Sequence, residues 1–220
     1  MTGKIKLVHS GGNAVSLAVP TSNPSASEVE FKLPQADGTS GQALVTDASG
    51  NLSFAGTGKI LQVVQGGRND VASQSTASEA LWTGHNIQVT ITPSNASNKI
   101  FIIANTHFTS SNDVNNISVI LQKQTGSGSF ASITAANGAI VGSREGAMTA
   151  VRQHGTYSII PQSFAYLDTA GSTSALTYRL AQYNVSGSTR TLYINQYHND
   201  ADGGDNVRTS SWIQVMEVAA

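Results

Sequence analysis

Cysteine is missing from this chain, and charged side chains are scarce. Without cysteine, neither a disulfide nor a thiolate metal site can contribute to the fold. Charged residues make up 11% of the sequence, compared with roughly 25% in an average globular protein. Twelve basic and thirteen acidic residues leave a net charge of -1. This balance offers no basic field for nucleic acid and no polybasic patch for a membrane surface, so we expect neither as a partner.

Long apolar runs are absent as well. No stretch approaches the roughly 18 apolar residues of a membrane-spanning helix. The N-terminal stretch MTGKIKLVHS lacks the apolar segment of a signal peptide. We therefore expect no membrane insertion and no cleaved leader.

Apolar residues are nevertheless frequent, at 39% of the chain, and they alternate with polar residues over short stretches. Alternation with period two, interrupted by Gly, Ser, Asn and Asp, is typical of strands and turns. No helical spacing persists, and Ser75–Leu81 allows one helical turn at most. The pattern predicts an all-β protein with a jelly-roll-like β-sandwich over residues 58–220. Its expected strands are Ile60–Gln65, Asn86–Ile91, Ile100–Phe108, Ile117–Gln122, Phe130–Ile133, Tyr157–Leu167, Ala175–Tyr183, Thr191–His198 and Trp212–Val218.

Individual strands differ in how many of their faces are apolar. Asn86–Ile91 is apolar on one face, with Gln88 and Thr90 outward. Residues 100–104 are apolar on both faces, which predicts a central strand that is buried on both sides. The last strand is also apolar on both faces, so it needs cover on both sides from a subunit interface or from an internal position. We expect a trimer interface on its second face, formed by Trp212, Met216 and Val218.

Residues 1–57 differ in character because their apolar rows are short and narrow. Apolar pairs at strand spacing occur at Ile5/Leu7, Val15/Leu17, Val29/Phe31 and Leu52/Phe54, with a further short strand at Ala43–Thr46. Turn residues stand at Asp37-Gly38 and Ser49-Gly50-Asn51, where glycine supplies the positive φ of a tight turn. Such hairpins are marginal alone. We expect a stalk that folds by intertwining with other copies, with Leu44, Leu52 and Phe54 at the trimer interface; the alternative is a loose arm on the head.

Motifs that carry catalysis are not found in the sequence. The five histidines lack metal-ligand spacing. The glycine-rich residues 125–129 lack the lysine of a phosphate-binding loop, and no Gly-x-Ser-x-Gly turn presents a serine nucleophile. Two carboxylates that cleave glycans need only ~5–10 Å of separation in space, which a sequence does not reveal. We expect a protein that is not an enzyme and holds no metal or cofactor, with a glycan-degrading tailspike-like enzyme as the rival.

One acidic loop is a candidate ligand site. Residues 199–206 contain Asp200, Asp202, Asp205 and Asn206, whose hard oxygen atoms suit Ca²⁺. A solvated loop explains the same composition. Loops at the end of a sandwich often carry recognition, so we expect this loop, followed by Gly142–Gly146, to contact the host.

A second candidate ligand site is the stripe formed by Tyr193, Asn195 and Tyr197, opposite Leu192 and Ile194. Aromatic rings cover the C–H surface of a sugar, and amides bond its hydroxyl groups. The alternative is that the stripe packs within a trimer interface.

The segment LPQADGTSGQALVTDASGNLSF, residues 33–54, resembles a segment that recurs in fibre-like structural proteins of tailed bacteriophages, especially those of marine bacteria. GKILQVVQ (58–65), ITPS (91–94), SNKI (97–100) and the closing VMEV (215–218) look like the C-terminal domain of the same proteins. The resemblance implies a homotrimeric virion protein. Residues 1–57 would form its N-terminal stalk, and residues 58–220 its C-terminal knob.

The resemblance also implies a function. We expect a fibre or spike on the outer surface of the virion, at the tail or the capsid. Its N-terminal segment would contact other virion proteins, and its head would bind a glycan or an outer-membrane component of the host. A capsid-decorating head fibre with a mainly structural role is the alternative.

Two departures from the family pattern stand out. Tail fibres usually carry a long N-terminal docking region, whereas this chain begins almost at the stalk, so tail, capsid and another fibre subunit all stay open as attachment points. Gly84-His85 also stands where the family commonly has Gly-Leu.

Overall fold

Strands, turns and loops make up every residue that the computed structural model describes, which are residues 4–18, 20, 22, 24–26, 28–39, 42–56, 59–111, 116–153, 158–204 and 206–220. Across these residues there is no helix, and hence none that is long and apolar enough to span a membrane. The predicted all-β class is therefore confirmed. The chain separates by its internal packing into an N-terminal unit, residues 1–57, and a C-terminal unit, residues 58–220.

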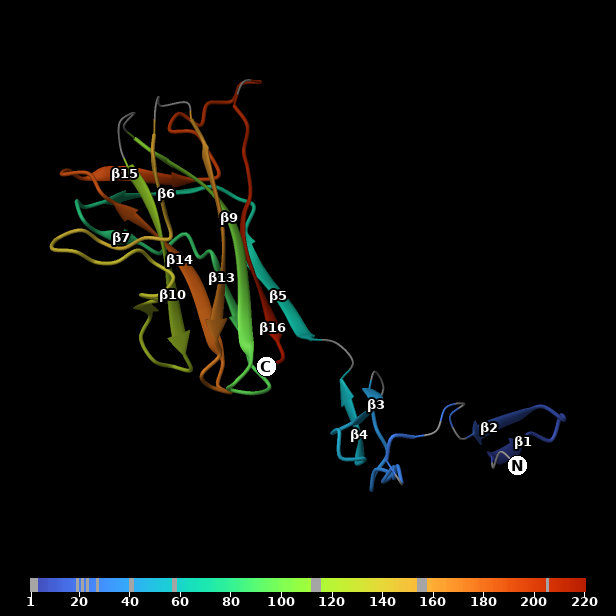
Figure 1. The fold of residues 1–220 in the computed structure, drawn as a ribbon. Helices are drawn as coiled ribbons and strands as arrows, with labels where there is room; N and C mark the ends of the chain where they lie inside the picture. The colour runs from blue at the N-terminus through green and yellow to red at the C-terminus, as the bar shows by residue number, and fades with distance from the viewer. Residues whose placement is uncertain are drawn as a thin grey trace. The chain divides into compact units, whose positions relative to one another are not determined.

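The described part of the N-terminal unit contains two antiparallel hairpins (Figure 1). In the first, β1 (Lys4–Val8) pairs with β2 (Ala14–Ala18). In the second, β3 (Gln42–Thr46) pairs with β4 (Leu52–Gly56), so that Leu44 lies directly opposite Phe54. Strands therefore form at four of the places where the sequence predicted them.

Asp47 closes the turn between β3 and β4. Its carboxylate accepts hydrogen bonds from the side-chain amide of Asn51 (2.6 Å) and from the backbone N–H groups of Ser49 (2.8 Å) and Asn51 (3.2 Å). These bonds, led by that from the Asn51 amide, lower the pKa of Asp47. Gly50 adopts a φ of +85°, the left-handed conformation that was predicted for this turn.

Gly38 has a different role from the one that was predicted. It is not among the glycines with positive φ. Instead, a Cβ at this position would collide with the ring of Phe54. Glycine at position 38 therefore leaves room for an aromatic side chain of β4, and the turn interpretation of Asp37-Gly38 is wrong in its physical reason.

Apolar side chains of the N-terminal unit are largely exposed. Leu44 is 49% exposed, Phe54 39% and Val15 72%. The strand expected around Val29 and Phe31 is wrong, because residues 28–39 contribute only a single bridge, between Lys32 and Asn51. The described residues of this unit thus contain strands but no shared hydrophobic core.

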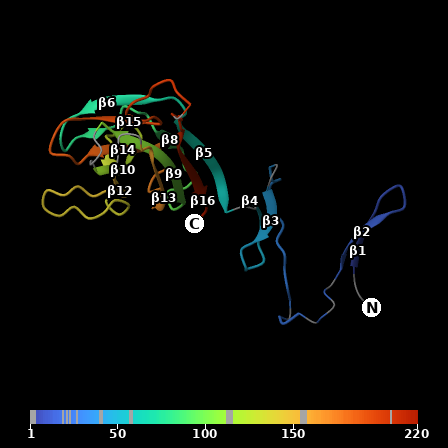
Figure 2. The same cartoon turned by 90° about the horizontal axis from the view of Figure 1, so that it is seen from above.

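The C-terminal unit is a β-sandwich of two six-stranded sheets (Figures 1 and 2). The first sheet consists of β5 (Ile60–Arg68), β6 (Ala72–Thr76), β9 (Lys99–Ser110), β13 (Ile160–Thr169), β15 (Arg190–Ile194) and β16 (Ser211–Val218). The second consists of β7 (Leu81–Trp82), β8 (Gln88–Ile91), β10 (Asn116–Thr125), β11 (Ala131–Ser132), β12 (Thr149–Arg152) and β14 (Leu176–Asn184). The jelly-roll-like sandwich that the sequence predicted is confirmed.

β9 is the central strand of the first sheet. It pairs with β13 along one edge and with β16, then β15, along the other. β5 lies beyond β16, and β6 lies beyond β15. The predicted central position of residues 100–104 is confirmed, but burial is complete on one side only: Ile100, Ile102 and Ala104 are buried, whereas Phe101 and Ile103 are half-buried.

The hydrophobic core fills the space between the two sheets. Residues contribute to it at every second position of a strand, as in β8, where Val89 and Ile91 are buried and Gln88 and Thr90 are exposed. This one-sided pattern was predicted. The largest fully buried side chains are Trp82, Ile87, Ile91, Ile100, Ile102, Phe108, Ile117, Ile120, Leu121, Leu176, Tyr178 and Leu180.

An ion pair joins the sheets at one end of the core. The ammonium of Lys123, in β10, lies 2.8 Å from a carboxylate oxygen of Asp168, in β13, and also donates to the carbonyl oxygens of Thr169 and Ala170. The same oxygen of Asp168 accepts a hydrogen bond from the hydroxyl of Tyr178 at 2.8 Å. Burial is the first cause that raises the pKa of Tyr178, and the negative charge of Asp168 adds to it.

The predicted strands of this unit are present, with shifted ends, but three elements were missed. β6 and β12 contain few large apolar residues, and β7 is only two residues long, so no alternating pattern indicated these strands. The helical turn suggested for Ser75–Leu81 is wrong. Ser75 and Thr76 instead pair with β15, and the amide of Asn184 donates to the carbonyl oxygens of Thr76 and Ala77 at 2.9 Å. Ser78 and Glu79 then form a turn, in which Glu79 has a φ of +55°.

A buried carboxylate holds the C-terminal strand in place. One oxygen of Glu217, in β16, accepts hydrogen bonds from the N–H (2.7 Å) and the hydroxyl (2.7 Å) of Ser94 and from the amide of Asn98 (2.6 Å). The other oxygen accepts a bond from the amide of Gln62, in β5, at 2.6 Å. Burial raises the pKa of Glu217, but the bonds from Asn98, Gln62 and Ser94 outweigh it and hold the pKa at about 2.

Glu217→Gln should therefore destabilise the fold. The amide keeps the size of the side chain but loses charge-assisted bonds, which are worth roughly 1.5–3 kcal/mol for a charged acceptor. Because the folded pKa lies below the ordinary value of 4.5, this stability is present above pH 4.5 and is lost as the pH falls toward 2.

Urea unfolding at pH 7 and pH 3 measures the effect. The variant should differ from the parent by the stated amount at pH 7 and by less at pH 3. The matched control is Glu79→Gln at an exposed position, where we expect a change within about 0.5 kcal/mol. Equal losses in the two variants would contradict the assignment.

Candidate interaction surfaces

The outer face of the first sheet carries a continuous apolar row. We define this outer face by the side chains of β5, β16, β9 and β13 that point away from the core. Register places Val63, Met216, Phe101 and Leu167 side by side across the four strands. Val63 is 51% exposed and Leu167 53%, while Met216 and Phe101 between them are half-buried. In the protein chain by itself, water contacts this row.

Neighbouring rows of the outer face are uncharged. The next row consists of Gln65, Gln214, Ile103 and Ala165, and the row after it of Gly67, Trp212, Asn105 and Ser163. On the other side of the apolar row lies Lys99, whose ammonium donates a hydrogen bond to the hydroxyl of Thr169 at 2.8 Å. The three rows therefore form an uncharged area with one cation at its border.

Where β8 pairs with β14, the outer face of the second sheet is polar instead. Gln88, Thr90, Thr177 and Arg179 point outward there. The hydroxyls of Thr90 and Thr177 lie 2.8 Å apart, and Arg179 donates to Gln122 at 2.8 Å. An antiparallel sandwich normally presents polar side chains on its outer faces, so the first sheet is the exception.

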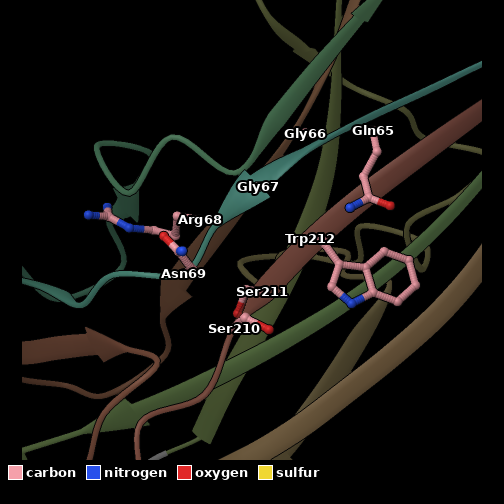
Figure 3. Close-up of a pocket in the computed structure, with 8 residues that line it drawn as sticks. All are labelled: Gln65, Gly66, Gly67, Arg68, Asn69, Ser210, Ser211 and Trp212. Atoms are coloured by element: carbon pink, nitrogen blue, oxygen red, sulfur yellow. The ribbon is translucent and has the colours of Figure 1, made fainter.

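A shallow hollow of about 400 Å³ lies beside Trp212 where β5 and β16 meet. Figure 3 shows the side chains of Gln65 and Trp212 on one side of the two strands, while the side chain of Arg68 extends away from them. Arg68 is occupied by Asp70, at 2.7 Å, and by the carbonyl oxygen of His85. The hollow therefore has polar and aromatic walls without a free charge.

Position 67, in the lining of this hollow, requires glycine. Its φ is +147°, a conformation that side chains rarely adopt, and a Cβ there would collide with the backbone of Ser211 and Trp212. Position 67 therefore adds no side chain to the row next to the indole of Trp212.

The residues predicted for a trimer interface fall into two sets, one in each unit. Trp212, Met216 and Val218 share the outer face of β16 and are half-buried. Leu44, Leu52 and Phe54 share one face of the β3–β4 hairpin, as its register requires. The sequence pattern therefore predicted correctly that the members of each set lie on one face of their strand or hairpin. Their role in a trimer stays a prediction.

The acidic loop holds an ion pair instead of converging carboxylates. Asp200 lies 2.6 Å from the guanidinium of Arg208, and their hydrogen bond is the first cause that raises the pKa of Arg208. Asp202 is exposed, and the amide of Asn206 donates to the carbonyl oxygen of Ala201 at 2.9 Å. Asp205 lies outside the described residues. The arrangement favours the solvated-loop alternative over a Ca²⁺ site.

The Tyr193, Asn195 and Tyr197 stripe is not a continuous strand face. β15 ends at Ile194, and Asn195 has a φ of +62°, which turns the chain. Asn195 is fully buried; its amide donates to the carbonyl oxygens of Arg68 and Asp70, and its oxygen accepts a bond from the hydroxyl of Ser211. The expectation that Asn195 offers its amide to a ligand is therefore wrong. Its amide instead fixes the loop that follows β5.

Tyr193, the first tyrosine of the stripe, contacts the ring of His198. The hydroxyl of Tyr193 lies 3.0 Å from Nδ1 of His198, and the two rings meet edge to face at 5.4 Å. Tyr197 is half-buried. The structure thus separates the three residues that the sequence suggested as one sugar-binding stripe.

Metal-ligating side chains do not cluster in the described residues. No group of three or more His, Cys, Asp or Glu side chains there could hold a metal ion. Glu217 and Asp168, the carboxylates with buried partners, are saturated by hydrogen bonds to protein groups. The Gly142–Gly146 loop is exposed at its beginning, next to Ile140 and Val141, which are 58% and 55% exposed.

The residues that sequence reasoning missed are Gln62, Ser94 and Asn98, the partners of Glu217. A signal for them was present. Ser94, Asn98 and Glu217 belong to the three segments ITPS, SNKI and VMEV that carried the family resemblance. The structure brings the polar members of these segments together at one carboxylate.

His85 is buried between aromatic rings, with centroid distances of 5.0 Å to Trp82 and 5.4 Å to Phe108. Its Nδ1 accepts a hydrogen bond from the N–H of Ile87 at 3.3 Å, and its Nε2 has no partner among the described residues. Burial is the main cause that lowers the pKa of His85 to about 3, and the charge of Arg68 adds to it. The imidazole is therefore neutral near pH 7.

Comparison with known proteins adds little to this description. No family model and no curated protein matches the chain. Among solved structures, the chain is similar to that of infectious bursal disease virus, Gx strain, with 11% identity and a TM-score of 0.35 over 94% of this chain and 48% of that one. It is also similar to the VP2 subviral particle of infectious bursal disease virus, with 12% identity and a TM-score of 0.32 over 95% and 48%.

The chain spans about half the length of the structures that it matches. TM-scores of this size carry no argument about function. What the fold and its surfaces define is an all-β protein with a sandwich unit and exposed apolar faces on both of its units.

His85 should give the stability of the C-terminal unit a pH dependence. Its folded pKa of about 3 lies below the ordinary value of 6.5, so the unfolded chain binds the proton first. The free energy of unfolding should fall by about 1.4 kcal/mol per pH unit as the pH drops below 6.5. Urea unfolding between pH 6.5 and pH 5 measures this slope, and His85→Leu should remove it. The same slope in parent and variant would show that His85 does not cause it.

Proposed function

We propose that this chain is a structural protein of a bacteriophage virion. It forms a homotrimeric fibre or spike on the outer surface, in which the N-terminal unit is the stalk and the C-terminal unit is the head. The stalk contacts other virion proteins, and the head contacts the surface of the host cell. The chain acts by assembly and binding, not by catalysis.

The observation that supports the trimer is the exposure of the N-terminal hairpins. Two-stranded hairpins are marginal in water, and here they expose the large side chains that would otherwise form a core: Leu7 is 66% exposed, Leu17 70% and Val15 72%. Burying such side chains contributes about 1.5–3 kcal/mol each. Copies of the same hairpins, related by symmetry, provide that burial and also cover the strand edges.

Resemblance supports the kind of assembly. The segment over residues 33–54 resembles fibre-like phage proteins, and it includes β3, the Asp47 turn and most of β4. The resembling segments of the head converge on Glu217. Trimeric symmetry is the arrangement that this resemblance implies.

Light scattering at micromolar concentration should therefore give close to three times the chain mass of 22.9 kDa. Leu44→Lys places a charge on the apolar face of the β3–β4 hairpin and should lower the measured mass toward that of one chain, because a buried charge without a partner costs several kcal/mol. Ser53→Lys is the matched control, since Ser53 lies on the other face of the same hairpin. A parent protein with the mass of a single chain would overturn the trimer.

Host attachment has its own test. Replacing Asp200, Asp202 and Asp205 with Ala should weaken binding to host cells by about tenfold, or about 1.4 kcal/mol. The melting temperature should hardly change, because the exposed ion pair of Asp200 with Arg208 contributes little to stability. The comparison is Asp37→Ala in the N-terminal unit, which should bind as well as the parent. Undiminished binding by the triple variant would exclude the loop as the receptor site.

A further inference from the structure

The apolar row of the outer face departs from the polar outer faces that antiparallel sandwiches normally present to water. Val63, Met216, Phe101 and Leu167 follow one another across four strands without a polar residue between them. Where β8 and β14 pair, the other sheet presents hydroxyl, amide and guanidinium groups on its outer face, and the apolar side chains further along that face, Ile120 and Ala181, are buried. The difference between the two sheets indicates that the first sheet has a partner that the second does not.

The chemistry of the outer face limits what that partner is. The three rows carry no charge, so a charged partner surface would lose its hydration without gaining ion pairs. Amides of Gln65 and Gln214 border the apolar row, that of Asn105 lies one row further away, and all three can exchange hydrogen bonds with other amides. A partner surface that is uncharged and apolar, with amides at its border, would complement this face. The same face on another copy of the chain has these properties.

The length of the connection between the units points to the same partner. Three residues separate Gly56, at the end of β4, from Ile60, at the beginning of β5, and such a stretch spans at most roughly 14 Å. If chains associate through residues 1–57, this short connection therefore keeps the first residues of β5 in the different chains near one another. The outer face starts at this end of β5, with Leu61 and Val63.

The area of the face is also consistent with this occupant. Four strands ~4.8 Å apart and about seven residues long cover roughly 400 Å². A standard interface buries ~800 Å² on each partner. The outer face therefore supplies about half of a stable contact, and the exposed apolar side chains of the N-terminal unit are available for the rest.

We infer that the outer face of the first sheet is the surface through which the heads of this protein pack against other copies of the chain. This inference rests on the trimer proposed above. In that trimer, β5, β16, β9 and β13 of each head face the symmetry axis, and the polar outer face of the second sheet faces water. The hollow beside Trp212 lies at the border of the contact.

Single cysteines test the inference directly, because the chain has none of its own. In the full-length protein, Val63→Cys should react with a maleimide at least tenfold more slowly than Gln88→Cys, which lies on the exposed outer face of the second sheet. After unfolding in urea, the two variants should react equally fast. Light scattering confirms that both are assembled.

Charge substitution provides the second arm. Val63→Lys and Leu167→Lys alter side chains that are about half exposed, so each head still folds, and the dissociation constant of the assembly should rise at least tenfold. Thr90→Lys, on the second sheet, should assemble as the parent does. Circular dichroism and melting of each variant separate lost assembly from lost folding.

The outcomes separate this inference from the proposed function. If the parent is a trimer while Val63→Cys reacts as fast as Gln88→Cys and Val63→Lys stays trimeric, the trimer stands and the head interface is wrong. If the parent is a single chain, the proposed function and this inference both fail. Slow reaction of Val63→Cys together with dissociation of Val63→Lys supports both.

Discussion

The carboxylate of Glu217 is the interaction on which the architecture of the C-terminal unit depends. It is buried as an anion and is stabilised by four hydrogen bonds, from Gln62, Ser94 and Asn98. Loss of one partner would leave a buried charge or donor unsatisfied, which costs more than an exposed bond. These bonds connect β5, the segment that precedes β9, and β16. The site thereby ties together β5, the start of β9 and β16, which are three of the four strands that form the outer face.

The two outer faces of the sandwich differ in their charged side chains. The low content of charge, 11% of residues, is not distributed evenly: the three rows of the first sheet have none, whereas Arg179 and its amide and hydroxyl neighbours lie on the second. Both sheets contribute side chains to the core, so the core alone does not explain this asymmetry. The asymmetry is instead the physical reason for proposing that the chain acts by assembly.

The sequence predicted strands correctly where the alternation of apolar and polar residues within the strand itself is clear. The alternation of Ile87, Val89 and Ile91 identified a strand with one buried face, and its orientation is correct. The prediction failed where contacts with residues that are distant in the sequence determine the local conformation. β6 is a strand because β15 pairs with it, although its own residues, ASQST, are polar. In the sequence, Asn195 continues the alternating stripe of Tyr193 and Tyr197. In the structure, its left-handed backbone conformation ends β15 and turns its amide toward the carbonyl oxygens of Arg68 and Asp70.

The sequence by itself determined the all-β class, the jelly-roll-like sandwich and the absence of disulfides, because period-two alternation and cysteine content are local properties of the chain. Only the tertiary structure decided which residues meet. Ser94, Asn98 and Glu217 are separated by more than 100 residues at the extremes, and no local pattern indicates that they share one charge. Likewise, Val63, Met216, Phe101 and Leu167 form a row only through strand register, which is set by the packing of two sheets and not by any single strand.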